Sequence, residues 1–142
     1  MTHGRLWGYL WAAPCSALGL LAAGVVWLFG ASARWRAGVL EVHPVGARHP
    51  VPAALRRVPF TCITLGHVVL AVSQAELERL RLHERAHVAQ YERWGPALWL
   101  AYPLASLFQW ARGGRAYRDN CFEVQARAVE RGPGAAGTSH PT

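Results

Sequence analysis

The feature that most limits how this chain can fold is an apolar stretch from Leu6 to Phe29, in which none of the 24 residues carries a charge. As a helix it would be about 36 Å long, which exceeds the roughly 30 Å hydrocarbon core of a bilayer. Tryptophans stand near both of its ends, as side chains at a membrane interface do. We therefore interpret residues 1–33 as an N-terminal membrane span.

A cleaved signal peptide is the alternative, because Ala31-Ser32-Ala33 resembles a signal-peptidase cleavage site. We favour a retained span, since the apolar stretch is long for a signal peptide and arginines follow it directly. Arg34 and Arg36 also indicate that the residues after the span lie on the cytoplasmic side of a bacterial membrane. A buried core helix is disfavoured because the remaining chain is too short to surround it.

Composition narrows the class of protein further. The 142 residues are enough for one domain, and the formal charge of +7 comes from scattered arginines without any lysine. No nucleic-acid-binding motif accompanies them, so we expect no nucleic-acid partner. Three cysteines lie far apart without a C-x-x-C pair, which predicts free thiols and no disulfide partner.

Two strand regions and a final helix are predicted from local patterns. Residues 38–45 alternate like a strand, and residues 60–72 are β-branched and apolar, with Gly66 marking either a hairpin turn or a bulge. Residues 48–59 are interpreted as an irregular connection. A last helix is predicted from Asn120 to Gly132, and residues 132–142 as a disordered tail. The folded domain would then comprise residues 34–131.

The best delimited element is a helix between these regions. Ser73-Gln74-Ala75-Glu76 has the form of a capping box, and Gly95-Pro96 is a strong helix terminator. This helix contains the sequence His83-Glu84-Arg85-Ala86-His87. Histidines four apart on a helix share one face and can bind one metal ion, while Glu84 can reach a water beside it. The alternative is an ordinary charge-rich surface helix.

A catalytic zinc site needs a third protein ligand. The candidates are Glu123, Asp119, Cys121, His67, His43 and His49. The run HERAHVAQYERWG, followed about thirty residues later by NCFEVQA, resembles the gluzincin class of zinc metallopeptidases. The stretch HVAQYERWGPALWLAYP also resembles small uncharacterised bacterial membrane-associated proteins that carry the HExxH motif. The resemblance covers residues 60–130.

This resemblance implies one Zn²⁺ per chain, with His83, His87 and Glu123 as ligands and Glu84 as general base. Glu123 has a second interpretation, because with Asn120 as N-cap it occupies the glutamate position of a capping box. The sequence departs from familiar gluzincins at Arg127, where an aspartate would be expected. For transition-state or substrate contacts, the candidates are His67, Tyr91, Tyr117 and Arg127. For His67 we favour the alternative of a hydrogen-bonded core histidine.

The uncharged residues 95–111 bear directly on Glu123. If they crossed a bilayer, His83 and Glu123 would lie on opposite sides and could not share a metal ion. We therefore expect a helix kinked at Pro103, lying beside the motif helix or at the membrane surface, which returns the chain to His83.

The expected fold is α+β: an N-terminal transmembrane helix, then a two- or three-stranded sheet packed on the HExxH helix, and two further helices. The expected function is hydrolysis of polypeptide bound along the strand at 60–72. A non-catalytic metal-binding membrane module and a structural membrane protein are the alternatives.

Overall fold

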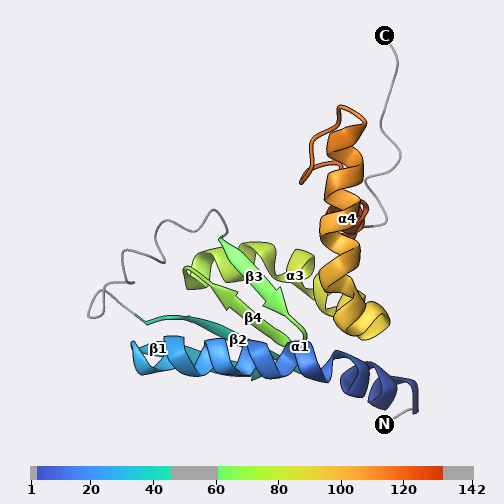
Figure 1. Ribbon diagram of the computed structural model, residues 1–142. Coiled ribbons are helices and arrows are strands. Elements are labelled where there is room, and N and C mark those ends of the chain that lie inside the picture. The colour runs from blue at the N-terminus through green and yellow to red at the C-terminus, as the bar shows by residue number, and fades with distance from the viewer. Residues whose placement is uncertain (1–2, 46–60, 133–142) are drawn as a thin grey trace.

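A computed structural model describes residues 3–45 and 61–132 (Figure 1). In chain order its elements are α1 (His3–Leu28), β1 (Ala31–Arg36), β2 (Val39–Pro44), β3 (Cys62–Leu65), β4 (Val68–Ala71), α3 (Gln74–Trp94), the 3₁₀ turn η1 (Gly95–Ala97), α4 (Leu98–Ala111) and α5 (Cys121–Arg131). The predicted α+β class, with an apolar N-terminal helix, a sheet and helices after the motif helix, is confirmed.

The sheet has four strands in the order β1-β2-β4-β3. Strands β2 and β4 run parallel, and the other two pairs are antiparallel. The expectation of two or three strands was too low because residues 31–36 pair with β2 along its whole length. The predicted boundary between residues 33 and 34 therefore falls inside β1.

The alternatives for residues 60–72 are resolved in favour of a hairpin. Gly66 has φ +61°, in the left-handed region that favours glycine, and it turns β3 back onto β4. Phe60 and the predicted connection at 48–59 lie outside the described residues, as does the predicted tail after Gly132.

Helix α3 begins and ends where its sequence predicts. The Glu76 N–H donates to Ser73 Oγ at 3.2 Å, while the Glu76 carboxylate accepts from Arg79 instead of completing a reciprocal capping box. At the other end Gly95 has φ +53° and stops the helix. The predicted motif helix is therefore confirmed at both ends.

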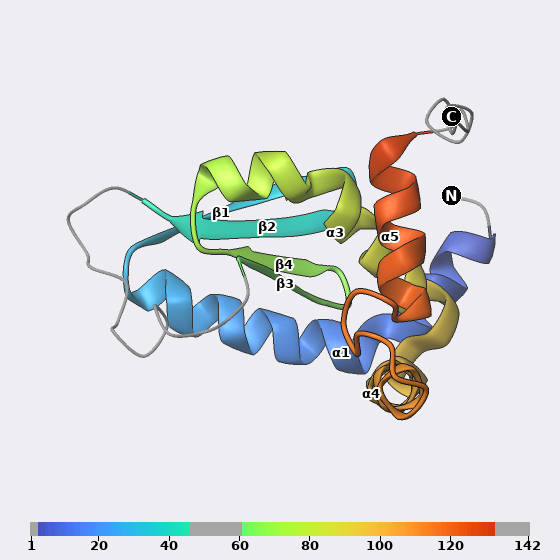
Figure 2. The same cartoon turned by 90° about the horizontal axis from the view of Figure 1, so that it is seen from above.

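The sheet is covered on both faces, by α3 on one and α1 on the other (Figure 2). Val39, Val69 and Ala71 pack with Leu77 and Val88 of α3. On the opposite face a second cluster joins the sheet to α1, with the members Ala23, Ala31, Val42 and Val68. Sandwiching between two helices gives this small sheet a core on each side.

Small residues form the buried face of α1. These are Gly8, Ala12, Cys15, Gly19 and Ala23, and the bulky residues of the helix point outward. A Cβ on Gly19 would lie 2.7 Å from both the Leu65 carbonyl oxygen and Val68 Cβ. The missing side chains therefore allow α1 to lie directly on the β3–β4 turn.

Among the described residues, Leu6–Leu28 of α1 is the one helical segment long and apolar enough to cross a membrane. Only 22% of the most apolar 18-residue stretch of this helix is buried, so protein does not enclose α1 on all sides. By length and composition, α1 could span a bilayer.

Helix α4 rises away from α1 and continues through Pro103 without interruption (Figure 1). It contacts the start of α5 through two side chains. Asn120 Nδ2 donates to the Tyr102 carbonyl at 3.0 Å and to Ser106 Oγ at 2.7 Å. The rings of Tyr102 and Phe122 stack with centroids 6.0 Å apart. The helical return predicted for residues 95–111 is therefore present, and it brings α5 back alongside α3.

The close approach at Gly19 yields a stability prediction. Gly19→Ala should lower the free energy of unfolding by about 1–3 kcal/mol, because the new Cβ meets backbone that cannot move aside. Gly24→Ala is the matched control on the same helix, where a Cβ would meet nothing within 4 Å. It should be neutral or stabilise by up to about 1 kcal/mol. Thermal unfolding of both variants in detergent would measure the difference, and equal midpoints would contradict tight docking of α1.

Candidate metal centre

Three side chains from two helices meet at one point inside the protein. His83 and His87 of α3 approach with their Nε2 atoms 3.1 Å apart. Glu123 of α5 places Oε2 3.3 Å from His83 Nε2 and Oε1 3.3 Å from His87 Nε2. Glu123 is 2% exposed, so this carboxylate is held away from water.

These separations suit a divalent ion. Four ligands placed tetrahedrally about 2.0–2.1 Å from zinc lie about 3.3–3.4 Å from one another. The three contacts at 3.1–3.3 Å match that spacing. Moreover, Glu123 Oε2 is buried without a hydrogen-bond partner among the described residues. The site could therefore hold a metal ion through His83, His87 and Glu123, as the motif predicts.

Gln90 sets the orientation of His87. Its Oε1 lies 2.9 Å from His87 Nδ1, and its Nε2 donates to the Phe122 carbonyl at 2.9 Å. Because a carbonyl oxygen only accepts, Nδ1 carries the proton and Nε2 is left with a lone pair towards Glu123. One side chain thus fixes the imidazole and joins α3 to α5.

Two acceptors that face each other need a cation or a proton between them. Burial lowers the pKa of His87, but hydrogen bonds with Glu123 and Gln90 outweigh burial and raise it. Burial likewise raises the pKa of Glu123, yet the imidazoles of His83 and His87 and the hydroxyl of Tyr102, which face the carboxylate, hold it well below the ordinary value. The site therefore keeps a carboxylate charge where a metal ion would neutralise it.

Glu123 is more than a helix cap. Tyr102 Oη donates to its Oε1 at 2.8 Å, and Arg127 Nη1 lies 3.8 Å from its Oε2. In a capping box, the glutamate carboxylate accepts a hydrogen bond from the N–H of the N-cap residue. Here the Asn120 N–H donates to the Tyr117 carbonyl instead. Asn120 alone caps α5, through a 2.9 Å bond from the Phe122 N–H. The cap-only interpretation does not describe this carboxylate.

Glu84 lies outside the three-ligand group but beside it. It is 5% exposed, and Thr64 Oγ1 of β3 donates to its Oε2 at 2.6 Å. This bond fixes the carboxylate between the motif helix and the sheet. Such a placement suits a proton acceptor near the metal position and not a fourth ligand.

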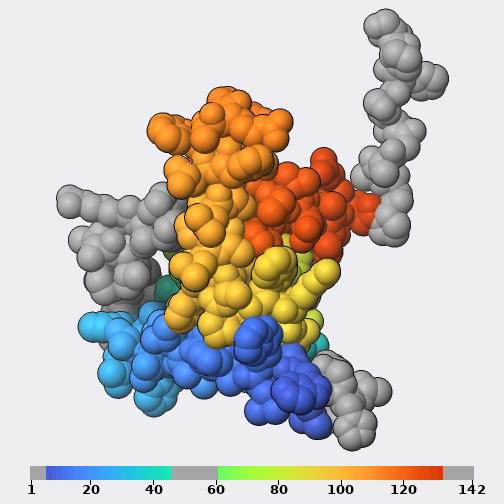
Figure 3. Space-filling view, turned by 45° about the vertical axis from the view of Figure 1, so that its right-hand side comes forward, coloured from blue at the N-terminus to red at the C-terminus, as the bar shows by residue number. Residues whose placement is uncertain are grey.

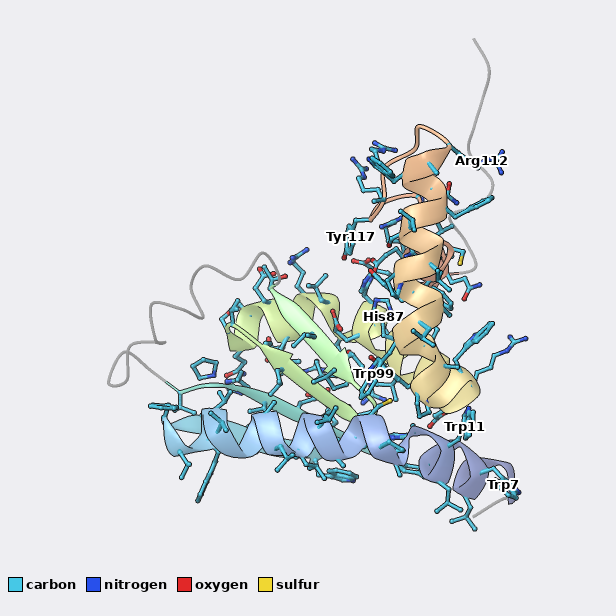
Figure 4. All side chains as sticks on the ribbon, in the orientation of Figure 1. Trp7, Trp11, His87, Trp99, Arg112 and Tyr117 are labelled. Atoms are coloured by element: carbon cyan, nitrogen blue, oxygen red, sulfur yellow. The ribbon has the colours of Figure 1, made fainter. Side chains whose placement is uncertain are left out.

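All four residues line one cavity of about 930 Å³. Its walls are β3 on one side and α3, α4 and α5 on the other. Figure 4 shows the side chains of Tyr117, His87 and Trp99 between α4 and the sheet, with Tyr117 coming from the loop after α4. The predicted contact residues Tyr91, Tyr117 and Arg127 also line the cavity. Burial, and then the charge of Glu123, raise the pKa of Tyr117 to about 12.

His67 is the predicted site residue that the structure places elsewhere. It is 4% exposed, bonds to Ser16 Oγ at 3.2 Å and Glu92 Oε1 at 3.0 Å, and stacks on Tyr9. These contacts belong to the packing of α1 on the hairpin, and His67 is absent from the cavity wall. His67 is therefore the hydrogen-bonded core histidine favoured from the sequence, and it does not reach the cavity because it occupies the turn that α1 covers.

The other candidates for the third ligand also lie elsewhere. Asp119 accepts hydrogen bonds from Arg115, Cys121 is exposed at the start of α5, and His43 sits on β2 with Nδ1 near the Pro44 carbonyl. His49 lies outside the described residues.

Three supporting residues escaped the sequence interpretation: Gln90, Tyr102 and Thr64. Gln90 had a local signal, since it follows His87 by three positions on a helix and therefore shares its face. Tyr102 and Thr64 had none, because only the return of α4 and the pairing of β3 bring them to the site.

No family model, no curated protein and no solved structure matches this chain. The resemblance to zinc metallopeptidases therefore stays a prediction that rests on the sequence motif.

The role of Gln90 can be tested by metal binding. Gln90→Leu should weaken zinc affinity by about 10–100-fold, because His87 loses the partner that orients it. The same substitution at Gln74, which is exposed on α3 and bonds Glu78, provides the control. Competition with a chromophoric chelator would report both affinities. Equal affinities for the two variants would show that Gln90 has no part in the site.

Proposed function

We propose that this protein is a zinc-dependent peptidase associated with a bacterial membrane through its N-terminal apolar helix. The observation that carries the proposal is the buried group His83, His87 and Glu123 at the wall of a cavity that also receives the Glu84 carboxylate. Two imidazoles and one carboxylate form a donor set that favours zinc over harder cations.

The reaction adds water across a peptide bond: a C–O bond forms at the carbonyl carbon, the C–N bond breaks, and the amine leaves with a proton. When bound, zinc would supply a Lewis acid that polarises the carbonyl and acidifies a water molecule. Glu84 would accept the proton of the attacking water and pass it to the leaving amine. Its orientation rests on the Thr64 hydrogen bond.

Developing negative charge on the carbonyl oxygen needs a donor. Tyr117 and Arg127 both line the cavity and are the candidates. The Tyr117 phenol, with its pKa raised to about 12, stays protonated at neutral pH and can donate a hydrogen bond.

Strand β3 offers a way to bind a polypeptide. Among residues 3–45 and 61–132 it pairs with β4 alone, so its other edge is unpaired there, and residues 61–65 line the cavity. An extended peptide can add to such an edge through main-chain hydrogen bonds, which are independent of its sequence. Ile63 and Leu65 on this strand, with Leu98 opposite, would contact apolar substrate side chains.

The proposal predicts a separation of binding from turnover at Glu84. Glu84→Gln should lower cleavage of unfolded casein by about 10²–10⁴-fold, since the amide cannot accept a proton. Zinc content should be unchanged because Glu84 is not in the ligand group. Glu78→Gln makes the same change at an exposed position of α3 and should cleave like wild type.

A wild-type chain that holds zinc but cleaves no more casein than Glu84→Gln would contradict the peptidase. It would favour the non-catalytic metal-binding module instead.

A further inference from the structure

All seven tryptophans of this chain are exposed. Their exposed fractions run from 41% for Trp99 to 73% for Trp7. A water-soluble domain normally buries most of so large an apolar side chain. Five of the seven belong to α1 and α4, namely Trp7, Trp11, Trp27, Trp99 and Trp110.

The remaining outward residues of α4 are also apolar. Leu100, Leu104, Leu107 and Phe108 are between 56% and 71% exposed, and no residue of α4 is charged. On α1 the outward set includes Leu10, Leu18, Leu21, Val25 and Leu28. We call these outward residues of α1 and α4, together with the five tryptophans, the apolar face. Figure 3 shows α4 rising from the place where the preceding turn η1 rests on α1.

The two helices lie along the same side of the molecule. In Figure 2 most of α1 runs along the lower side of the molecule, although its N-terminal turns rise away from that side, and α4 is seen end-on there, with β1, β2 and α3 above them. One plane can therefore touch α4 and most of α1, apart from its N-terminal turns. An isolated apolar helix would give only a line of contact.

A bilayer crossed by α1 does not suit this arrangement. Gly8 packs on the Glu92 side chain and Gly19 on the β3–β4 turn, so the domain lies against α1 over most of its length. Crossing would carry the neighbouring charges, such as Glu92, into hydrocarbon, where each is costly. A helix lying in the interface keeps those charges in water.

Charge favours a particular membrane. Arg112 follows α4 directly and makes no ion pair within the described residues, whereas Arg34 and Arg36 lie on β1, away from the apolar face. Arginines at the ends of apolar helices bind lipid phosphates, and an anionic surface attracts a chain of net charge +7.

We propose that the apolar face docks this protein onto an anionic bilayer, with α1 and α4 lying in the interface and not crossing it. This differs from the single span predicted from the sequence. Because Trp99 and Pro103 of α4 also line the cavity, the bilayer then adjoins its rim. This placement leads us to infer that the substrates are apolar polypeptide segments at the membrane surface, an inference that also rests on the proposed peptidase function.

Introducing negative charge on α4 tests whether the apolar face binds lipid. Leu100→Glu with Leu107→Glu should weaken binding of the full chain to vesicles of phosphatidylglycerol and phosphatidylcholine by at least about tenfold. Leu82→Glu with Val129→Glu is the matched control, at residues 55% and 52% exposed on α3 and α5. It should bind within about twofold of wild type. Equal vesicle binding by the two double variants would overturn the proposal that the apolar face docks on the bilayer.

Labelling tests the orientation. In a Cys15→Ala, Cys62→Ala background, the exposed Cys121 and an introduced Thr2→Cys would be labelled with an impermeant maleimide in spheroplasts. An in-plane α1 predicts that the two positions are labelled together or protected together. Labelling of one and protection of the other would show that α1 spans the membrane and would overturn the proposal.

Failure of the membrane-docking proposal can be distinguished from failure of the peptidase proposal. Glu84→Gln should bind vesicles like wild type whatever its effect on cleavage. The α4 double variant should retain its zinc and cleave soluble casein, yet lose at least about tenfold of its rate on an apolar peptide anchored to vesicles. If that rate is unchanged, the inferred substrate class is wrong even though the surface binds lipid.

Discussion

The buried carboxylate of Glu123 is the constraint around which the helices of this protein are arranged. A charge removed from water is stable only when neighbouring groups compensate it. Those groups come from three elements: His83 and His87 from α3, Tyr102 from α4, and Arg127 from α5 itself. A metal ion would complete the compensation, and its binding would then stabilise the contacts of α5 and α4 with α3.

Helix α3 can serve this site because the rest of the chain holds it on its opposite side. The sheet supports it through apolar contacts, and Thr64 reaches from β3 to orient Glu84. Helix α1 closes the far face of the sheet with a row of small residues and thus displays its bulky ones outward. Packing of the domain and exposure of an apolar surface are therefore two consequences of one helix pattern.

Local signals predicted the parts of the structure that depend on local physics. Ser73 and Gly95 delimited α3, and the i, i+4 histidines identified the face of α3 that carries the candidate metal ligands. Strand β1 was missed because Arg34 and Arg36 suggested the flank of a span, whereas pairing with β2 makes residues 31–36 a strand. Likewise, Tyr102 reaches Glu123 only through the tertiary return of α4, which no local pattern encodes. Whether the site turns over peptide stays a prediction.

The most direct test of the metal centre is elemental analysis of the purified full chain in detergent. The account predicts about one zinc ion per wild-type chain, lost in His83→Ala and weakened by at least about tenfold in Glu123→Gln. Asp119→Asn should keep its zinc, because Asp119 pairs with Arg115 outside the site. A folded wild-type chain without zinc, or zinc retained in His83→Ala, would contradict the centre and leave α3 a charged helix.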